Sequence, residues 1–405
     1  MRVGLVYDAD YPWDIRVWKV VTALADHGHD VHLICRNLTR RPAEESTPDL
    51  TIHRLRLLPG AGLNGIGTFP AFVNPVWIRR IAEVVRAVGI EALIVRDLPL
   101  ALAGVAVGRR HRVPVVLDMA ENYPAMLRDV TQFERFRVQN VLVRSPLLAT
   151  MVERLAARLV DHIVVVIEEA RDRLVGAGIP ANRISIVRNT PKVDLTQFPA
   201  EWGAAESDGT RLTLAFVGGL EPMRGLEAAL EMLARAVRLV PELRFKIIGD
   251  GRWRGDLEAQ ARALGLTAHV EFAGRREYQR ALFEVQQADI GLIPHRVTAH
   301  TSSTIPNKLF EYMLLGKPVL ATDMPPVRRV INEVDCGLVY RSLDEGVEAL
   351  ARLRDVALRR RLGENGRRAV LDRYRWDHDG AELVRAVGRV AALRRRAVSV
   401  SDVSL

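Results

Sequence analysis

Cysteine, lysine and long apolar runs are scarce in this sequence, and each scarcity narrows the classes of protein that it encodes. The only cysteines, Cys35 and Cys336, lie far apart along the chain. Two isolated thiols cannot build a multi-cysteine zinc site, so we interpret both as buried apolar residues. No run of about 18 apolar residues occurs, and the sequence therefore predicts no transmembrane helix.

The N-terminus lacks the layout of a secretory signal. Residues 2–7 form a short strand-like pattern, without a charged segment, an apolar stretch and a small-residue cleavage site in succession. We therefore expect a cytoplasmic protein, with peripheral attachment to the inner face of the plasma membrane as an alternative.

Positive charge comes almost entirely from arginine. Lysine and arginine total 58 against 49 acidic residues, only five of the 58 are lysines, and the net charge is +9. A surface for anionic lipid, a phosphate-binding cleft and an arginine-rich genome each explain this excess. Nucleic-acid binding is not expected, because no helix-turn-helix, zinc-finger or aromatic-basic signature accompanies the charge. No acidic pair or histidine cluster has metal-ligand spacing, so we expect no metal ion.

The length of 405 residues and the hydrophobic content of 48% fit two packed domains of about 200 residues each. Short apolar runs separated by helical patterns predict an α/β fold with a parallel sheet in each half. In the first half the expected strands are 3–7, 31–34, 92–95, 115–117, 163–167 and 184–187. In the second half they are 212–217, 244–248, 270–272, 290–294, 318–321 and 337–339.

These patterns divide the chain into two Rossmann-like doubly wound domains, residues 1–195 and 196–374, joined by a polar linker. We expect the two domains to face a cleft, because clefts between domains are common ligand sites. The segment 133–159 mixes arginines with apolar residues at helical spacing. This segment is either an amphipathic surface for a membrane or a lipid acceptor, or a helix whose apolar residues face the core of the domain.

Two glycine turns in the second half are expected at the same edge of its sheet. Glycines there let the backbone approach a ligand, and a following helix N-terminus favours phosphate oxygens. Arg224 adds a fork of donors suited to a diphosphate. A plain tight turn is the alternative for either. The turn residues are Gly218 and Gly219 after the first strand, and Gly249, Asp250 and Gly251 after the second.

A third segment is more specific. A helix is expected to begin near Asn307, and Lys308 lies in its first turn, where a cation opposes the helix dipole unless it serves an anion. Glu311 follows at i+3 on the same face, where its carboxylate can accept hydrogen bonds from two ribose hydroxyls. The alternative is a surface Lys–Glu pair. The hydroxyls just before the helix suit a phosphate and belong to Ser302, Ser303 and Thr304.

Residues 308–319, Lys-Leu-Phe-Glu-Tyr-Met-Leu-Leu-Gly-Lys-Pro-Val, resemble the donor-site motif of family-4 (group 1) glycosyltransferases of GT-B fold. The resemblance implies a retaining transferase whose substrate is a nucleotide-diphosphate sugar, with no metal and no cofactor. It also implies that a C-terminal helix, 375–405, packs back on the first domain. The segments that extend the similarity over nearly the whole chain are 14–17, 28–31, 183–189, 216–225, 247–251, 270–274 and 288–294.

The resemblance also implies roles for single residues of the donor half. Glu311 would bind the donor ribose, Arg224 and Lys308 would balance the diphosphate, and the loop 302–307 would contact the diphosphate and the sugar. Because the leaving diphosphate gains charge, fixed cations lower the barrier to transfer, so Arg224 and Lys308 are the catalytic candidates of this half.

The acceptor-side candidates lie in the first half. Asp118 and Glu121 follow a predicted strand, where either can position an acceptor hydroxyl or act as a base, and capping the following turn is the alternative. Arg16, at the start of the first helix, either reaches the cleft or lies on the surface. The acceptor remains open between a lipid-linked saccharide, a growing polysaccharide and a small metabolite. We expect a role in polysaccharide, cell-wall or glycolipid synthesis.

Three positions depart from the family pattern. Ser303 and Gly219 stand where many members have a glutamate and an arginine, and Ala120 stands where relatives often have a histidine. These departures support a second hypothesis, a non-catalytic partner subunit that binds a nucleotide sugar or a protein. A third hypothesis, a UDP-sugar epimerase of the same fold, would use His295 and His300.

Overall fold

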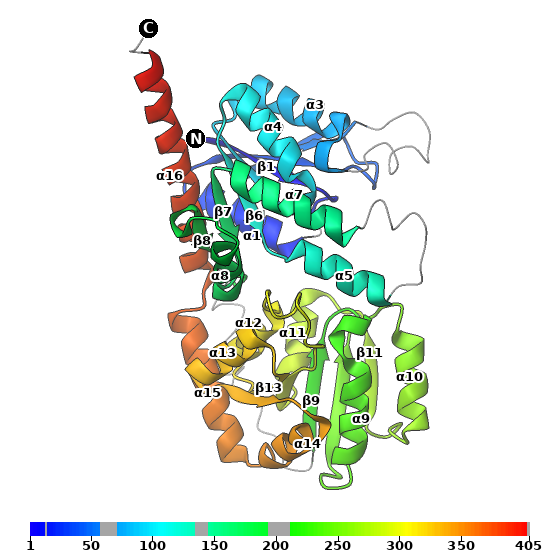
Figure 1. Ribbon diagram of the computed structural model, residues 1–405. Coiled ribbons are helices and arrows are strands. Elements are labelled where there is room, and N and C mark those ends of the chain that lie inside the picture. The colour runs from blue at the N-terminus through cyan, green and yellow to red at the C-terminus, as the bar shows by residue number, and fades with distance from the viewer. Residues whose placement is uncertain (13, 57–70, 134–144, 193–210, 403–405) are drawn as a thin grey trace. The chain divides into compact units, whose positions relative to one another are not determined.

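The computed structural model describes residues 1–12, 14–56, 71–133, 145–192 and 211–402 (Figure 1). The chain divides into two compact units, which we call unit 1 (Met1–Asn189 with Trp376–Leu405) and unit 2 (Thr190–Arg375). The expected domain boundary between residues 195 and 196 lies outside the described residues, as does the part of segment 133–159 that spans 134–144.

Unit 1 is built on an eight-stranded sheet in the order β3-β4-β2-β1-β5-β6-β7-β8. The strands pair in parallel, except that β3 and β4 form an antiparallel hairpin at one edge. The strands expected in this half are all present, whereas the hairpin was not expected. The strands are β1 (Arg2–Tyr7), β2 (Asp30–Cys35), β3 (Glu44–Thr47), β4 (Leu50–Arg54), β5 (Ala92–Arg96), β6 (Val115–Met119), β7 (His162–Val165) and β8 (Ile184–Ile186).

Helices cover both faces of this sheet (Figure 1). The first helix begins after Asp14, whose carboxylate accepts hydrogen bonds from the backbone N–H groups of Arg16 and Val17. On the opposite face, Gly104 lets a helix lie close to the sheet, since a Cβ there would be 2.4 Å from Val95 Cγ2. The helices are α1 (Ile15–Asp26), α3 (Pro75–Val84), α4 (Ala101–His111), α5 (Tyr123–Phe133), α7 (Pro146–Leu159), α8 (Glu168–Gly176) and α16 (Trp376–Asp402).

The C-terminal helix α16 belongs to the core of unit 1. Its side chains Leu383 and Val387 are buried in the same cluster as Leu24 of α1 and the central strands. Trp376, the first residue of α16, donates from Nε1 to the carbonyl oxygen of Lys19 at 3.1 Å. The ammonium of Lys19 lies 4.9 Å from the centroid of the same indole ring. α16 therefore completes one face of unit 1.

Unit 2 contains a six-stranded sheet in the order β11-β10-β9-β12-β13-β14, in which every pair is parallel. Its strands are β9 (Leu212–Val217), β10 (Leu243–Ile248), β11 (Val270–Gly274), β12 (Ile290–Ile293), β13 (Val319–Thr322) and β14 (Gly337–Tyr340). Its helices are α9 (Leu226–Ala236), α10 (Arg254–Ala263), α11 (Tyr278–Gln286), α12 (Asn307–Leu314), α13 (Pro325–Val334), α14 (Leu343–Arg352) and α15 (Val356–Asp372).

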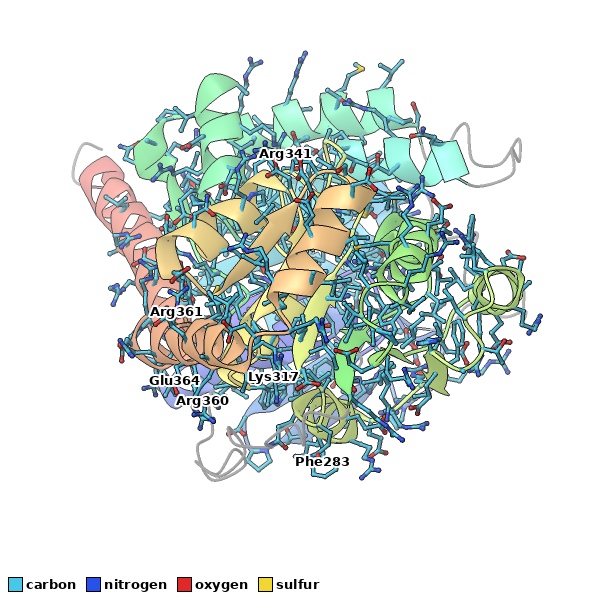
Figure 2. All side chains as sticks on the ribbon, turned by 90° about the horizontal axis from the view of Figure 1, so that it is seen from below. Phe283, Lys317, Arg341, Arg360, Arg361 and Glu364 are labelled. Carbon is cyan, nitrogen blue, oxygen red and sulfur yellow. The ribbon has the colours of Figure 1, made fainter. Side chains whose placement is uncertain are left out.

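Two helices of unit 2, α13 and α15, have sequences with weak helical signals. α13 starts with two prolines, which the first turn of a helix tolerates because its N–H groups have no partner within the helix. α15 is rich in arginine and buries a narrow stripe that includes Leu362. Its outer side carries Arg360, Arg361 and Glu364 (Figure 2).

The strand order of unit 2 reverses between β9 and β12. Their carboxyl ends, Val217 and Ile293, therefore lie on neighbouring strands, while the connections that leave them run in opposite directions along the sheet. Ligands of doubly wound sheets bind at such a reversal, outside the carboxyl ends of the strands. A functional site is therefore expected at the loops after β9, β10 and β12.

Candidate functional site

Glycines bring the loops after β9, β10 and β12 into backbone contact. Gly249 has φ of +153°, and a Cβ there would lie 1.9 Å from the carbonyl oxygen of Gly218. Gly225 has φ of +64°, and a Cβ there would lie 2.0 Å from the carbonyl oxygen of Pro294. Since no side chain fits at Gly225 or Gly249, these turns require glycine for close approach as well as for their conformation.

The remaining positions of the glycine turns differ in whether a side chain fits there. A Cβ at Gly251 would lie 2.5 Å from the carbonyl oxygen of Leu220, so this position is also closed to side chains. At Gly219 the nearest atom would be 3.9 Å away, and a side chain would fit there. Asp250 uses one carboxylate oxygen to accept from the backbone N–H of Gly251 at 2.8 Å. Asp250 is thus engaged within its own turn.

Three basic side chains meet beside these turns, and we call Arg224, His295 and Lys308 the cation cluster. Arg224 ends the 3-10 turn Pro222–Arg224, His295 lies just beyond β12, and Lys308 is in the first turn of α12. The Nε2 of His295 is 3.3 Å from Lys308 Nζ and 3.5 Å from Arg224 Nη1. Lys308 Nζ also lies 3.9 Å from the centroid of the Phe216 ring.

In the cation cluster Lys308 and His295 are buried and Arg224 is half-buried, and this burial alters the pKa values of the buried pair. Burial, with the charge on Arg224, holds the pKa of Lys308 well below its ordinary value, while Glu311 acts in the opposite direction. Burial, with the charges on Lys308 and Arg224, likewise holds the pKa of His295 well below its ordinary value. An anion placed among the three side chains would stabilise the charged forms, so the cluster suits a phosphate or a diphosphate.

Helix α12 is held in position by Tyr312. The phenol ring packs on Gly291, where a Cβ would be 2.2 Å from the ring, and its hydroxyl accepts from the backbone N–H of Val217 at 3.1 Å. One turn earlier, Lys308 Nζ would lie 3.0 Å from a Cβ at Gly218. The start of α12 is therefore fixed against the loop after β9. Its N-cap residue is Pro306, whose ring cannot accept a hydrogen bond, so the first amides of the helix receive no capping side chain from it.

The loop before α12 is shaped by its own hydroxyl groups. Ser303 Oγ donates to the carbonyl oxygens of Ala299 and His300, at 2.7 and 3.1 Å, and its side chain is buried. Thr301 Oγ1 donates to the carbonyl oxygen of Arg296 at 2.7 Å. These bonds set the loop conformation. Of the residues of this loop predicted to contact the ligand, Ser303 is buried, whereas Ser302, Thr304 and Asn307 are half-buried.

Glu311 lies one turn along α12 from Lys308 and is half-buried. Its Oε1 accepts a hydrogen bond from the hydroxyl of Tyr278, the first residue of α11, at 3.1 Å. Sequence reasoning did not find Tyr278, which has no motif of its own. Its place at the start of a helix after β11 was the available signal, because that position also lies at the carboxyl edge of the sheet.

In unit 1, Arg16 and Asp118 form a buried ion pair. Arg16 Nε donates to Asp118 Oδ2 at 2.9 Å, and Arg16 Nη2 donates to Asp118 Oδ1 at 2.6 Å. Arg16 also donates to the carbonyl oxygen of Val187 at 3.2 Å. Both side chains are almost fully buried, so of the two alternatives for Arg16 the surface position is wrong. Burial raises the pKa of Asp118, but the charge and hydrogen bonds of Arg16 outweigh it and hold the pKa below its ordinary value.

Asp97 is a candidate that sequence reasoning missed. It follows β5 with φ of +62°, and its carboxylate lies 2.7 Å from Arg96 Nη1 and 3.3 Å from the backbone nitrogen of Ala120. Burial raises the pKa of Asp97 to about 6, an effect that Arg96 opposes and that Asp118 and Glu121 increase. Asp97 thus lies close enough to Asp118 and Glu121 for their charges to act on it, at the carboxyl edge of the sheet of unit 1.

A group of metal ligands and a membrane-spanning helix are both absent from the described part of the chain. Its His, Cys, Asp and Glu side chains nowhere gather in a group of three that could hold a metal ion. None of its helices is long and apolar enough to cross a membrane.

Family models match both halves of the chain. The model for glycosyl transferases group 1 matches residues 200–369, and the model for a glycosyl transferase 4-like domain matches residues 14–190. Alpha-D-kanosaminyltransferase of Streptomyces kanamyceticus is 25% identical over 282 residues, which are 67% of this chain and 69% of that protein. Phosphatidyl-myo-inositol mannosyltransferase of Mycobacterium leprae is 28% identical over 184 residues, 44% of this chain. That match spans about half of the mannosyltransferase, 47% of its length.

Solved structures share the fold. Sucrose-phosphate synthase from Thermosynechococcus elongatus has a TM-score of 0.78 at 16% identity, covering 97% of this chain and 99% of that one. Anabaena HepE in complex with UDP has a TM-score of 0.67 at 12% identity, covering 96% and 100%. At these identities the likeness shows the fold alone, two parallel-sheet α/β domains of GT-B type. With both halves matched by family models, the chain belongs to the group 1 glycosyltransferases, with a family 4-like N-terminal domain.

Proposed function

We propose that the chain transfers a sugar from a nucleotide-diphosphate sugar to an acceptor hydroxyl, with retention of anomeric configuration and without a metal ion or cofactor. The observation that carries this proposal is the buried Lys308 beside Arg224, at the start of α12 and against the glycine turns. A buried ammonium beside a half-buried guanidinium is more favourable when an anion binds to both. A diphosphate is such an anion, and family membership supplies the reaction class.

The proposed reaction moves charge toward the cation cluster. The bond between the anomeric carbon and the phosphate oxygen breaks, and its electron pair passes to the leaving diphosphate, which Arg224, Lys308 and the first amides of α12 stabilise. The acceptor oxygen bonds to the anomeric carbon, and its proton passes to the leaving phosphate or to an acceptor-side carboxylate. Glu311 accepts hydrogen bonds from the ribose hydroxyls, with its carboxylate oriented by Tyr278.

On the acceptor side we assign the contacts with the hydroxyl to Glu121 and Asp97. Both oxygens of Asp118 already accept from Arg16, and a carboxylate with a lowered pKa is a weak base. Asp118 is better suited to fix Arg16 and the end of β6. Asp97 has a pKa of about 6, which matches a group that takes a proton near neutral pH.

We further propose that the acceptor is a saccharide or a lipid-linked saccharide met at an anionic membrane surface. An apolar ridge on α7 supports this, since Leu147, Met151 and Leu155 follow one another at i+4 spacing with exposures of 79%, 68% and 48%. Arg154 and Arg158 are exposed on the same helix. Apolar side chains flanked by arginines are typical of helices that lie in the headgroup region of anionic bilayers.

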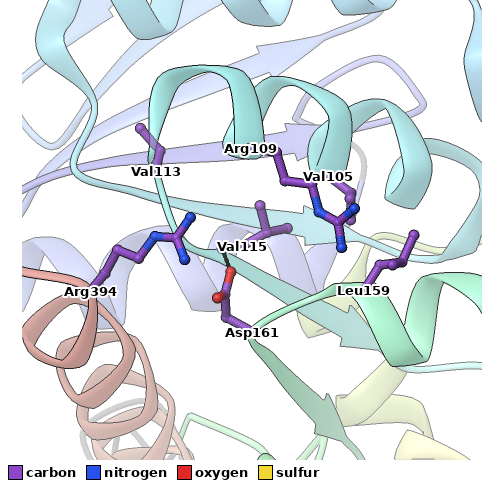
Figure 3. A pocket seen from close by; sticks show the side chains of 7 residues that line it. All are labelled: Val105, Arg109, Val113, Val115, Leu159, Asp161 and Arg394. Atoms are coloured by element: carbon purple, nitrogen blue, oxygen red, sulfur yellow. Dashed lines mark hydrogen bonds between the residues drawn. The ribbon is translucent and has the colours of Figure 1, made fainter. Parts of the chain in front are cut away.

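The ridge ends at a small basic cavity. Leu159, one further i+4 step along α7, lines a cavity of about 130 Å³ together with Asp161, Arg109 of α4 and Arg394 of α16 (Figure 3). Asp161 is fixed there by accepting from the backbone N–H of Val115 at 2.8 Å. Two guanidinium groups beside an apolar ridge give this side of unit 1 the charge needed to receive a lipid phosphate.

Cosedimentation with vesicles tests the membrane contact. The wild type is expected to bind vesicles that contain phosphatidylglycerol more than pure phosphatidylcholine vesicles, and Met151→Glu should weaken that binding at least tenfold. Leu239→Ser is the matched control, because Leu239 is 61% exposed on unit 2 and lies outside the ridge. Equal binding by the wild type and Met151→Glu would contradict the assignment.

Donor binding is tested by thermal shift against UDP-, GDP- and ADP-sugars, since a ligand of the native state raises Tm by mass action. We expect one nucleotide class to raise Tm, and Glu311→Ala to weaken that ligand about tenfold through the loss of hydrogen bonds to the ribose. Glu364→Ala, an exposed change on α15, is the control. No shift with any of the three classes would refute the proposed function.

A non-catalytic nucleotide-sugar-binding subunit is the second candidate. Ser303 favours it, because this position carries no acid and its hydroxyl donates to the loop carbonyls of Ala299 and His300. Nucleotide release in the presence of acceptor extracts separates the two candidates. Binding of a donor with no release under any condition would support the non-catalytic subunit.

A further inference from the structure

His295 has a hydrogen-bonding position that no motif accounts for. It lies just beyond β12, only 2% exposed, with its Nε2 between Lys308 Nζ and Arg224 Nη1 at 3.3 and 3.5 Å. Its backbone is fixed too, because its carbonyl oxygen accepts from Thr322 Oγ1 at 2.6 Å. The imidazole is therefore held in one place between the two cations assigned to the diphosphate.

The identity of the neighbours determines the tautomer of His295. The guanidinium of Arg224 can only donate hydrogen bonds, so the Nε2 that it contacts must be the acceptor. The ring proton then resides on Nδ1, and the imidazole is neutral. A protonated imidazole would instead place three positive charges within hydrogen-bonding distance of one another, which a buried site does not tolerate without an anion.

The charged surroundings of His295 are mostly positive. Arg224 faces it from the turn after β9, Lys308 from α12, and His300 from the loop between β12 and α12. Glu311 is the acidic group that acts on the cluster, through Lys308. Burial and these cations depress the pKa of both Lys308 and His295, so the empty cluster holds fewer protons than its residue types would carry in water.

We propose that His295 is a binding residue of the cluster: without a ligand its neutral imidazole accepts hydrogen bonds from Lys308 and Arg224 at Nε2, and when a diphosphate binds, Nε2 takes up a proton from solvent and donates to the diphosphate. This inference rests on the proposed function. The negative charge of the incoming diphosphate favours the protonated form of the imidazole, so binding strengthens as pH falls. No bond forms or breaks, and the proton comes from water or buffer.

Two substitutions separate hydrogen-bond acceptance from titration. His295→Gln keeps an acceptor oxygen but cannot be protonated, whereas His295→Leu removes the acceptor and keeps similar bulk. Isothermal titration calorimetry with pyrophosphate, UDP, GDP and ADP measures affinity, and repeating it in PIPES and in Tris measures protons taken up. His378→Gln, an exposed histidine of unit 1, is the matched control. Thermal unfolding of each variant confirms that it is folded.

We expect the wild type to take up a fraction of a proton and to bind more tightly as pH falls from about 8 to about 6. His295→Gln should keep its affinity within about threefold and lose most of the uptake. His295→Leu, if folded, should bind about tenfold more weakly, the effect of losing a hydrogen bond to charged groups. His378→Gln should match the wild type.

Three results would overturn this inference alone: wild-type affinity in His295→Leu, equally weak binding by the Gln and Leu variants, or binding by the wild type without proton uptake. If the wild type binds none of the four ligands, the proposed function fails and this inference fails with it. The two failures are thus distinguished by the wild-type titration.

Discussion

Replacement of Lys317 by methionine is expected to stabilise unit 2. Lys317 follows α12, is 6% exposed, and is marked in Figure 2. Burial lowers its pKa from 10.5 to about 8, an effect that Asp289 opposes and Arg359 increases. Each pKa unit corresponds to about 1.4 kcal/mol, so keeping this ammonium charged costs the folded state about 3 kcal/mol at neutral pH. Methionine has a similar volume and no charge, and removes that cost.

The pH dependence gives this prediction a second test. Because the folded pKa lies below the unfolded one, the unfolded chain binds more protons between about pH 8 and 10.5, and wild-type stability should rise through that window. Urea unfolding between about pH 7 and 10.5 should show a higher midpoint for Lys317→Met at pH 7 and a flatter pH profile. Lys192→Met, an exposed change, should stay within about 0.5 kcal/mol of the wild type. Unchanged midpoints, or parallel pH profiles for the wild type and Lys317→Met, would refute the reasoning.

Three further predictions concern both units. Arg16→Met should lower the free energy of unfolding by about 3–5 kcal/mol, because Asp118 stays buried without its partner, and adding Asp118→Leu should recover part of the loss in urea unfolding. Asp97 should contribute stability that is lost as pH rises from about 4 to about 6, since its folded pKa is raised, and Asp97→Asn should remove this contribution relative to the wild type in a pH series followed by circular dichroism. Gly249→Ala should abolish pyrophosphate binding in a calorimetric titration or lower Tm by several degrees, because its Cβ would meet the carbonyl oxygen of Gly218, whereas Gly219→Ala should be tolerated.

The sequence predicts the fold well where strands are buried on both faces. Such strands are continuous apolar runs, and those expected in both halves are present within a residue or two. The hairpin strand β3 could not be found this way, because its residues, Glu-Glu-Ser-Thr, are mostly exposed and carry no alternation. α15 was hidden for a related reason, since its buried stripe lies among many arginines. A strand at a sheet edge, or a helix with a narrow buried stripe, has too few apolar residues in sequence to be predicted from hydrophobic periodicity.

The candidate site was predictable where local geometry decides it. Gly249, Arg224 and Lys308 could be proposed from the turns and the helix start that hold them, although their roles stay predictions. Contacts between distant segments could not be foreseen. Arg16 and Asp118 are 102 residues apart, and nothing in either local sequence reveals that they pair. His295 is closer to Lys308 in sequence. Its contacts with Lys308 and Arg224 nevertheless depend on the distance between two loops, which tertiary packing alone determines.

The return of α16 to unit 1 has a consequence for how the protein is made. The ribosome releases residues 1–189 first, yet one face of their core stays open until Trp376 and the helix after it have emerged. Synthesis of residues 190–375 takes on the order of 10–40 s at typical translation rates. During that interval the apolar side of α1, including Leu24, lacks its cover. Unit 1, whose residues 1–189 emerge first, is therefore completed last, and its apolar face stays uncovered until the final helix emerges.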